Sequence, residues 1–142
     1  ALANSYGGWI VYGVEEKAKA EPVAGAFPGI DAADADPALQ RIRQAVAQQM
    51  NPAAHFDARA VAGDGVIFAA DRVVICLRVP RSLAAPHVHT TGRIYRRVAD
   101  GSEPKPENDR HLLDQLFRRS DDLRKEFAEW VDRQPDYRKR VA

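Results

Sequence analysis

The sequence predicts an α+β fold, with a mixed, mostly antiparallel sheet, flanking helices, and a long C-terminal helix or helix pair. Apolar runs rich in β-forming residues occur at 7–14 and 72–80, and helical periodicity occurs at 37–50 and again at 107–133. The chain has 142 residues, 45% of them hydrophobic and 29% charged, which suits a single hydrophobic core. No apolar run approaches the roughly 18 residues of a membrane span, so we expect no membrane association.

The first apolar run, "GGWIVYGV" at residues 7–14, is expected to be a central strand buried on both faces, because apolar residues occupy both sets of alternating positions. Its glycine pair precedes a strand and therefore lacks the helix N-terminus that holds phosphate in glycine-rich loops. We interpret Gly8 as a turn or a close backbone approach. The polar stretch that follows is expected to be loop, apart from "PVAGAF" at 22–27, which has the composition of an edge strand.

The middle of the chain has the pattern of a helix followed by a half-buried strand. Asp36 as N-cap and Pro37 in the first turn begin an amphipathic helix that ends at Asn51 and Pro52. Strict alternation of apolar and polar residues then predicts a half-buried strand in "HFDARAVA", residues 55–62.

The second half of the predicted sheet contains the strongest strand signal. The run at 72–80 is expected to be a central strand ended by Pro80, with Cys76 as a reduced core residue. A last strand is expected at 93–98, with Arg93, Tyr95 and Arg97 on a face that points outward.

Positive charge is concentrated between residues 72 and 99, a segment that contains no aspartate or glutamate. Its arginines are Arg72, Arg78, Arg81, Arg93, Arg96 and Arg97. Such a block indicates a polyanionic partner, although scattered surface arginines on two strands explain it equally well. If the partner is a nucleic acid, we expect mainly phosphate contacts, because guanidinium groups pair well with phosphate oxygens. The candidate contacts are Arg81, His87, Arg93, Arg96 and Arg97.

The apolar stripe at 107–133 predicts one long helix, or two helices joined at Ser120. At 1.5 Å per residue, about 40 Å of helix exceeds one face of a small domain. A protruding end needs an apolar partner, and self-association is one explanation. Its candidate residues are Leu116, Leu123, Phe127 and Trp130.

Two further groups of residues are weak candidates for metal chemistry. Glu15 and Glu16 follow the first strand, where two carboxylates are able to bind a divalent cation, but neighbours on a strand point in opposite directions and a solvated loop start explains them as well. His87 and His89 are spaced for one side of an extended chain, yet no third zinc ligand is evident, so we interpret His87 as an anion contact. We expect no metal and no cofactor.

Three stretches, in this order, resemble the Schlafen AlbA-type domain, a module of many bacterial proteins that is described as DNA-binding. They are "ANSYGGWIVYGVEE", "VVICLRVPRSLAAPHV" and "GRIYRRVADGSEPKP", and the resemblance as a whole extends over about residues 1–106. The matching positions are Asn4, Gly7, Gly8, Gly13 and Val14, then Val79, Pro80, Ser82, Pro86 and His87, then Tyr95, Arg97, Val98 and Ser102. The Gly-Ser of the family is altered here, which places Asp100 beside the basic strand.

The resemblance implies a compact α+β domain that binds nucleic acid, often fused to a winged helix in bacterial regulators. In animal relatives a similar domain cuts RNA with two glutamates upstream of the glycine pair and an acid after the first strand, and only that last acid is matched here, by Glu15 or Glu16. We therefore expect a DNA-binding domain at 1–106 that lacks its N-terminal part, DNA being favoured over RNA, and a helical extension at 107–142.

Two other functions stay open. One is a metal-dependent nuclease that is incomplete in this chain, and the other is a self-association scaffold. We expect that this chain is not itself an enzyme. The absence of Met at the start suggests a fragment of a longer protein, and the single cysteine favours a cytoplasmic location.

Overall fold

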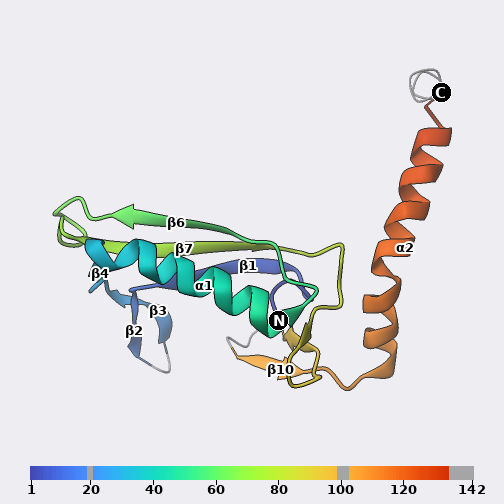
Figure 1. Ribbon diagram of the computed structural model, residues 1–142, viewed down its shortest axis with the longest axis horizontal. Coiled ribbons are helices and arrows are strands. Elements are labelled where there is room, and N and C mark those ends of the chain that lie inside the picture. Colours follow the sequence, from blue (N-terminus) through green and yellow to red (C-terminus); the bar gives the residue numbers. More distant parts are fainter. Residues whose placement is uncertain (19–20, 99–102, 135–142) are drawn as a thin grey trace.

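A computed structural model describes residues 1–18, 21–98 and 103–134 (Figure 1). It confirms the α+β class, with two α-helices and several small sheets. Every strand pairing in these ranges is antiparallel, so the sheet that we expected to be mixed is antiparallel throughout its described part. Asp100 and Ser102 lie outside the described residues. Neither helix in the described ranges has the length and apolarity that a membrane crossing requires.

The strand β7 (Arg72–Pro80) is the centre of the main sheet, as predicted. Val73 pairs with Ala62 of β6 (Asp57–Ala62) and also with Ile30 of β4 (Ile30–Asp31), so these two strands lie on opposite edges of β7. β1 (Gly7–Tyr12) pairs with the second half of β7, on the edge that β4 occupies. The strand that was expected at 55–62 exists as β6, but the expected half-burial is wrong, because only Ala58 is partly buried and the other residues of β6 are exposed.

The helix α1 (Ala35–Gln49) covers one face of this sheet and forms the core with it (Figure 1). Ala38 and Leu39 from the helix meet Ile75 and Leu77 from β7, and Ile75 is fully buried. The helix begins at Ala35, one residue before the predicted N-cap Asp36, because the short 3-10 helix η1 (Ala32–Asp34) leads directly into it.

Two further burial predictions for the sheet are wrong. β1 is an edge strand in the described part of the chain, and Trp9, Ile10, Val11 and Tyr12 are 62%, 49%, 48% and 56% exposed. The cause is its pairing with β7 alone, which leaves its outer edge and much of both faces uncovered. Cys76, which we expected in the core, is only half-buried, because it points to the face opposite Ile75 and Leu77, away from α1.

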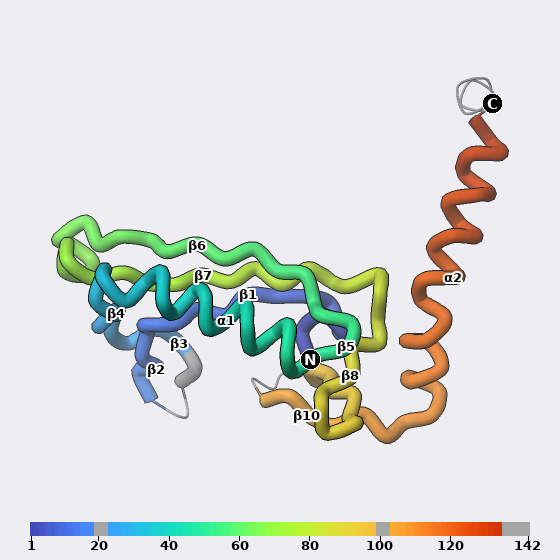
Figure 2. Tube along the Cα trace, in the orientation of Figure 1, coloured from blue at the N-terminus to red at the C-terminus, as the bar shows by residue number. Residues whose placement is uncertain are grey.

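The described ranges also contain three two-stranded ladders outside the main sheet. β2 (Glu15–Ala18) pairs with β3 (Glu21–Ala26), so the expected edge strand is confirmed, whereas the expected loop around Glu15 is a strand. β5 (Met50–Asn51) pairs with β8 (Val88–His89), and β9 (Tyr95–Arg97) pairs with β10 (Pro104–Pro106). β5, β8 and β10 gather near the N-terminus (Figure 2). The predicted last strand therefore exists as β9, but it pairs outside the main sheet.

The C-terminal pattern forms a single helix, α2 (Arg110–Asp132), which continues through Ser120. Asp109 caps it, because one carboxylate oxygen accepts hydrogen bonds from the backbone N–H groups of His111 and Leu112 at 2.8 and 3.2 Å. α2 stands at one end of the sheet and extends away from it (Figure 1).

Candidate nucleic-acid interface

The residues before β1 organise the loops that carry the basic side chains. Asn4 is 1% exposed, and its side-chain amide N–H groups donate to the carbonyl oxygens of His87 (2.9 Å) and Tyr95 (3.0 Å). Its amide oxygen accepts from the backbone N–H of His87 at 2.8 Å. One buried side chain therefore joins the N-terminal segment, the loop after β7 and the strand β9.

Ser5 and Ala3 extend the same connection. The backbone N–H of Arg97 donates to the Ser5 hydroxyl at 2.9 Å, and that hydroxyl donates to the Arg97 carbonyl at 3.3 Å. The backbone N–H of Ser82 donates to the Ala3 carbonyl at 2.9 Å. The backbone at Arg97 is thus fixed independently of its guanidinium group.

Arg119 attaches α2 to this end of the molecule. Its guanidinium donates to the backbone carbonyls of Asn4 (2.9 Å), Ser82 (3.1 Å) and Ala3 (3.4 Å). Burial lowers the pKa of Arg119, and the positive charges of Arg81 and Arg96 lower it further. The group remains a cation at neutral pH, since arginine starts from a very high pKa. Arg81, from the loop after β7, and Arg96, from β9, therefore lie close enough to Arg119 for their positive charges to act on it.

The structure brings four of the five predicted contact residues to this end. Arg81, Arg93 and Arg97 are exposed, whereas Arg96 is half-buried and forms an ion pair with Glu107 at 2.9 Å. Lys105 lies opposite Arg96 in the ladder of β9 and β10. We call this group of cations the basic end. Its members are Arg81, Arg93, Arg96, Arg97, Lys105 and Arg119.

His87, the fifth predicted residue, is not on this exposed surface. It is 5% exposed, and its Nδ1 lies 2.6 Å from the carbonyl oxygen of Pro52, so Nδ1 carries the proton and donates it. His89 makes a separate local contact, in which its Nδ1 lies 3.0 Å from the hydroxyl of Thr91. We therefore leave His87 out of the proposed phosphate contacts.

The acidic pair lies elsewhere. Glu15 and Glu16 are both exposed on β2, in the ladder with β3. Within residues 1–18, 21–98 and 103–134, no group of three or more histidine, cysteine, aspartate or glutamate side chains is arranged to hold a metal ion. In the described part of the chain, no observation favours the nuclease alternative.

The four residues predicted for self-association differ in exposure. Leu116 is 2% exposed and is covered by the chain itself, so its side chain is not available to a second copy. Leu123, Phe127 and Trp130 are 40%, 63% and 42% exposed, and the rings of Phe127 and Trp130 stack with centroids 6.0 Å apart. Self-association through these three residues stays a prediction.

Sequence reasoning missed the structural role of Asn4 and the contribution of Arg119 and Lys105. Asn4 was noted only as a motif residue, and a short polar residue ahead of a glycine pair gives no sign of burial. Arg119 lies among other charged residues of α2, a pattern that is typical of a solvent-exposed helix face and that does not single it out. The apolar stripe at 107–133 predicted the helix, but it did not show which arginine of the helix faces the domain.

The family model described as Schlafen, AlbA_2 matches residues 1–106, which contain the main sheet, α1 and all of the basic end except Arg119. This match confirms the resemblance seen in the sequence. No curated protein and no solved structure matches the chain.

Proposed function

Because the match over residues 1–106 shows that the chain belongs to the Schlafen AlbA_2 family, we propose that it binds DNA through the basic end. Membership of this family is consistent with a nucleic-acid-binding domain. The choice of DNA over RNA, and a role within a bacterial transcription regulator, are parts of this proposal. The exposed cations Arg81, Arg93 and Arg97 make the direct contacts, and Arg96 and Arg119 add to the positive potential.

The observation that carries the proposal is the concentration of positive charge around Arg119. Burial lowers the pKa of Arg119, and the positive charges of Arg81, from the loop after β7, and of Arg96, from β9, lower it further. Like charges brought together repel, and an anion placed among them relieves that repulsion. Glu107 is paired with Arg96 and offsets part of this charge. The side chains of Arg81, Arg93 and Arg97 are exposed to solvent, where phosphate oxygens can reach them.

Contacts of this kind position a protein on DNA without reading its sequence. We therefore expect weak sequence preference.

The test replaces two arginines of the basic end. Arg93→Ala with Arg97→Ala is expected to weaken binding to a DNA oligonucleotide about 100-fold at low salt, on the basis of about tenfold for each lost charged contact. The backbone hydrogen bonds between Ser5 and Arg97 do not depend on the guanidinium, so the fold should persist. Filter binding at low salt measures the change.

The matched control is Arg118→Ala with Arg124→Ala. Both residues lie on α2 in exposed ion pairs with Asp114 and Asp121, and the change in net charge is the same. We expect this control to bind within about threefold of the wild type, since both arginines are exposed and already paired with aspartates of the same helix. Equal losses in both double variants would mean that total charge, and not the basic end, determines binding.

A further inference from the structure

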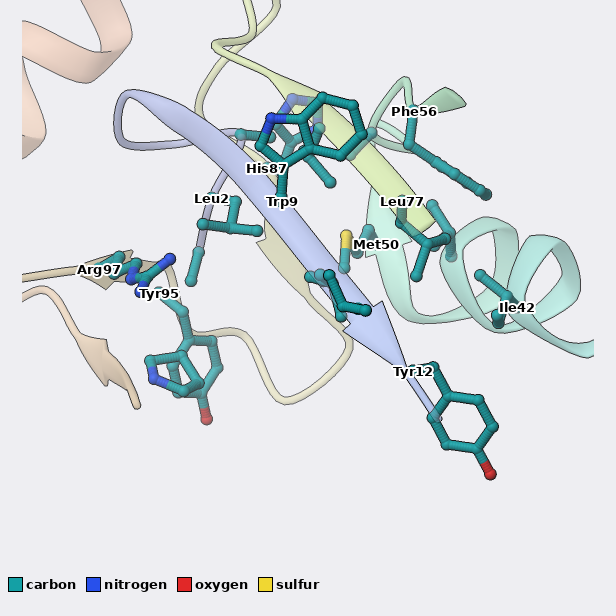
Figure 3. A pocket seen from close by; sticks show the side chains of 18 of the residues that line it. Leu2, Trp9, Tyr12, Ile42, Met50, Phe56, Leu77, His87, Tyr95 and Arg97 are labelled. Carbon is teal, nitrogen blue, oxygen red and sulfur yellow. The ribbon is translucent and has the colours of Figure 1, made fainter. Parts of the chain in front are cut away.

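The main sheet has one face that no helix of the described chain covers, because α1 lies on the opposite face and α2 extends away from the sheet (Figure 1). Ile75 and Leu77 of β7 point toward α1, and the cavity on that side has Leu77 and Ile42 in its wall (Figure 3). Side chains alternate along a strand, and residues paired across strands share a face. We call the side away from α1 the open face. Its members are Trp9 and Val11 of β1, Cys76 and Arg78 of β7, and Asp57, Arg59 and Val61 of β6.

The open face exposes apolar side chains on adjacent strands. Trp9, Val11 and Val61 are 62%, 48% and 46% exposed, and Cys76 on the central strand between them is half-buried. Single exposed apolar residues are ordinary, whereas a contiguous strip of them marks an interaction surface. The open face therefore has the character of a surface that a partner covers.

The second half of α2 offers another apolar surface without cover in the described chain. Leu123, Phe127 and Trp130 follow one another at spacings of four and three residues, so they form one stripe along the helix. Arg119 holds the first half of α2 against the domain, and the helix continues unbroken through Ser120. Its second half therefore lies beyond the end of the sheet and does not reach the open face of its own chain (Figure 1).

The free charges of the open face are positive. Arg59 and Arg78 are exposed, and neither forms an ion pair with a carboxylate of the described residues. Asp57 lies opposite Arg78 in the strand pair, but its carboxylate is 4.0 Å from Nε2 of His55 instead. A partner with carboxylates beside an apolar strip would match this surface.

The stripe of α2 is bordered by carboxylates of this kind. Glu126 lies three residues after Leu123 and four before Trp130, so it neighbours both on the helix surface. Asp122 is one turn before Glu126. Both acids are exposed, and neither is in an ion pair within the part of the chain that the structure describes.

The two surfaces also agree in size. At 1.5 Å per residue, the stripe from Leu123 to Trp130 is about 10 Å long. The open face spans three strands, which at a spacing of about 4.8 Å are also about 10 Å across.

We infer that the second half of α2 packs across the open face of a second copy of this chain, with Glu126 and Asp122 next to the partner's Arg78 and the partner's Arg59. Each copy carries both surfaces, so two copies exchange their helices and close a dimer. The inference does not depend on DNA binding.

A second copy fits the open face better than a nucleic acid strand does. A strand would use Arg59 and Arg78, and a base would stack on Trp9, but Val11, Val61 and Cys76 would stay uncovered. The helix stripe covers these apolar residues and supplies carboxylates at its border. It also gains cover for its own apolar residues.

The test exchanges charges across the proposed contact. Arg78→Glu and Glu126→Arg both alter exposed side chains, so neither should affect folding. Each variant alone is expected to raise the dissociation constant of the dimer about tenfold or more, because each sets like charges against one another at both contacts. An equimolar mixture of the two variants should dimerise within about threefold of the wild type, since both contacts in the mixed dimer then join opposite charges. Sedimentation equilibrium measures all three.

Arg43→Glu is the matched control for Arg78→Glu. Arg43 is exposed on α1, on the other side of the sheet, and the change in net charge is the same. We expect this variant to dimerise as the wild type does.

Four results would overturn the inference. The first is a wild-type chain that stays monomeric up to about 1 mM, a concentration at which even weak association is seen. The second is a dimer that Glu126→Arg dissociates and Arg78→Glu does not, which would mean that the helices pair with each other. The third is a mixture of the two variants that stays monomeric. The fourth is an Arg78→Glu variant that loses DNA affinity while its dimerisation is unchanged, which would assign the open face to nucleic acid.

Discussion

Asn4→Ala is expected to lower the free energy of unfolding by about 3–5 kcal/mol, because three hydrogen bonds are lost and their partners stay buried. The partners are the backbone N–H and carbonyl of His87 and the carbonyl of Tyr95, at 2.8 to 3.0 Å. Alanine satisfies none of them, and at 1% exposure the site admits little water in compensation. Urea denaturation followed by circular dichroism measures the change.

Asn108→Ala is the control for this substitution, since Asn108 is exposed. We expect it to change stability by less than about 0.5 kcal/mol. A loss at Asn4 as small as that at Asn108 would mean that the Asn4 side chain does not join the three segments in solution.

Gly7→Ala is expected to destabilise the protein by more than about 3 kcal/mol, because backbone strain and a steric clash act together. Gly7 has a φ of +80°, a conformation that alanine rarely adopts. An added Cβ would lie 2.6 Å from the Val79 carbonyl oxygen and 2.8 Å from the Arg81 nitrogen. Both are backbone atoms, so neither can move without disturbing β7. The expected result is a large fall in the urea midpoint, or failure to fold.

Gly92→Ala separates the two causes. Gly92 has a φ of +76°, close to that of Gly7, but an added Cβ would meet no atom within 4 Å. We expect a loss of only about 1–2 kcal/mol there, from backbone strain alone. Similar losses at the two glycines would show that the close approach of Gly7 to β7 contributes nothing.

The elements with a strong periodic pattern were the ones that the sequence predicted well. The apolar stripe of α1 and the long apolar run of β7 both face one core, so their pattern reports burial directly. The C-terminal stripe predicted α2, and the structure decides between one helix and two because the helix continues through Ser120.

The exposure of β1 was not predictable from its residues. Apolar side chains show that a strand gains from burial, but they do not show whether a neighbour covers it, and β1 pairs with β7 alone among the described strands. The strand β2 was missed for a related reason. Its polar residues gain backbone hydrogen bonds from β3 and need no buried face.

For the candidate site, charge along the chain located the arginines, but contacts between distant residues decided their roles. Asn4 meets His87 and Tyr95 across 83 and 91 residues, and Arg119 meets Asn4 across 115. No local pattern encodes such pairs. The burial of His87 follows from the same contacts, which hold its backbone below the surface.

The most direct test of the central claim is the salt dependence of DNA binding by the wild-type chain. With three exposed arginines on phosphates, the logarithm of the binding constant should fall linearly with the logarithm of salt concentration, with a slope of about −2 to −3. Affinity should therefore drop at least about tenfold between roughly 50 and 200 mM salt. Absence of binding at the lower concentration, or an affinity that does not change between the two, would contradict the assignment of the basic end as a DNA-binding surface.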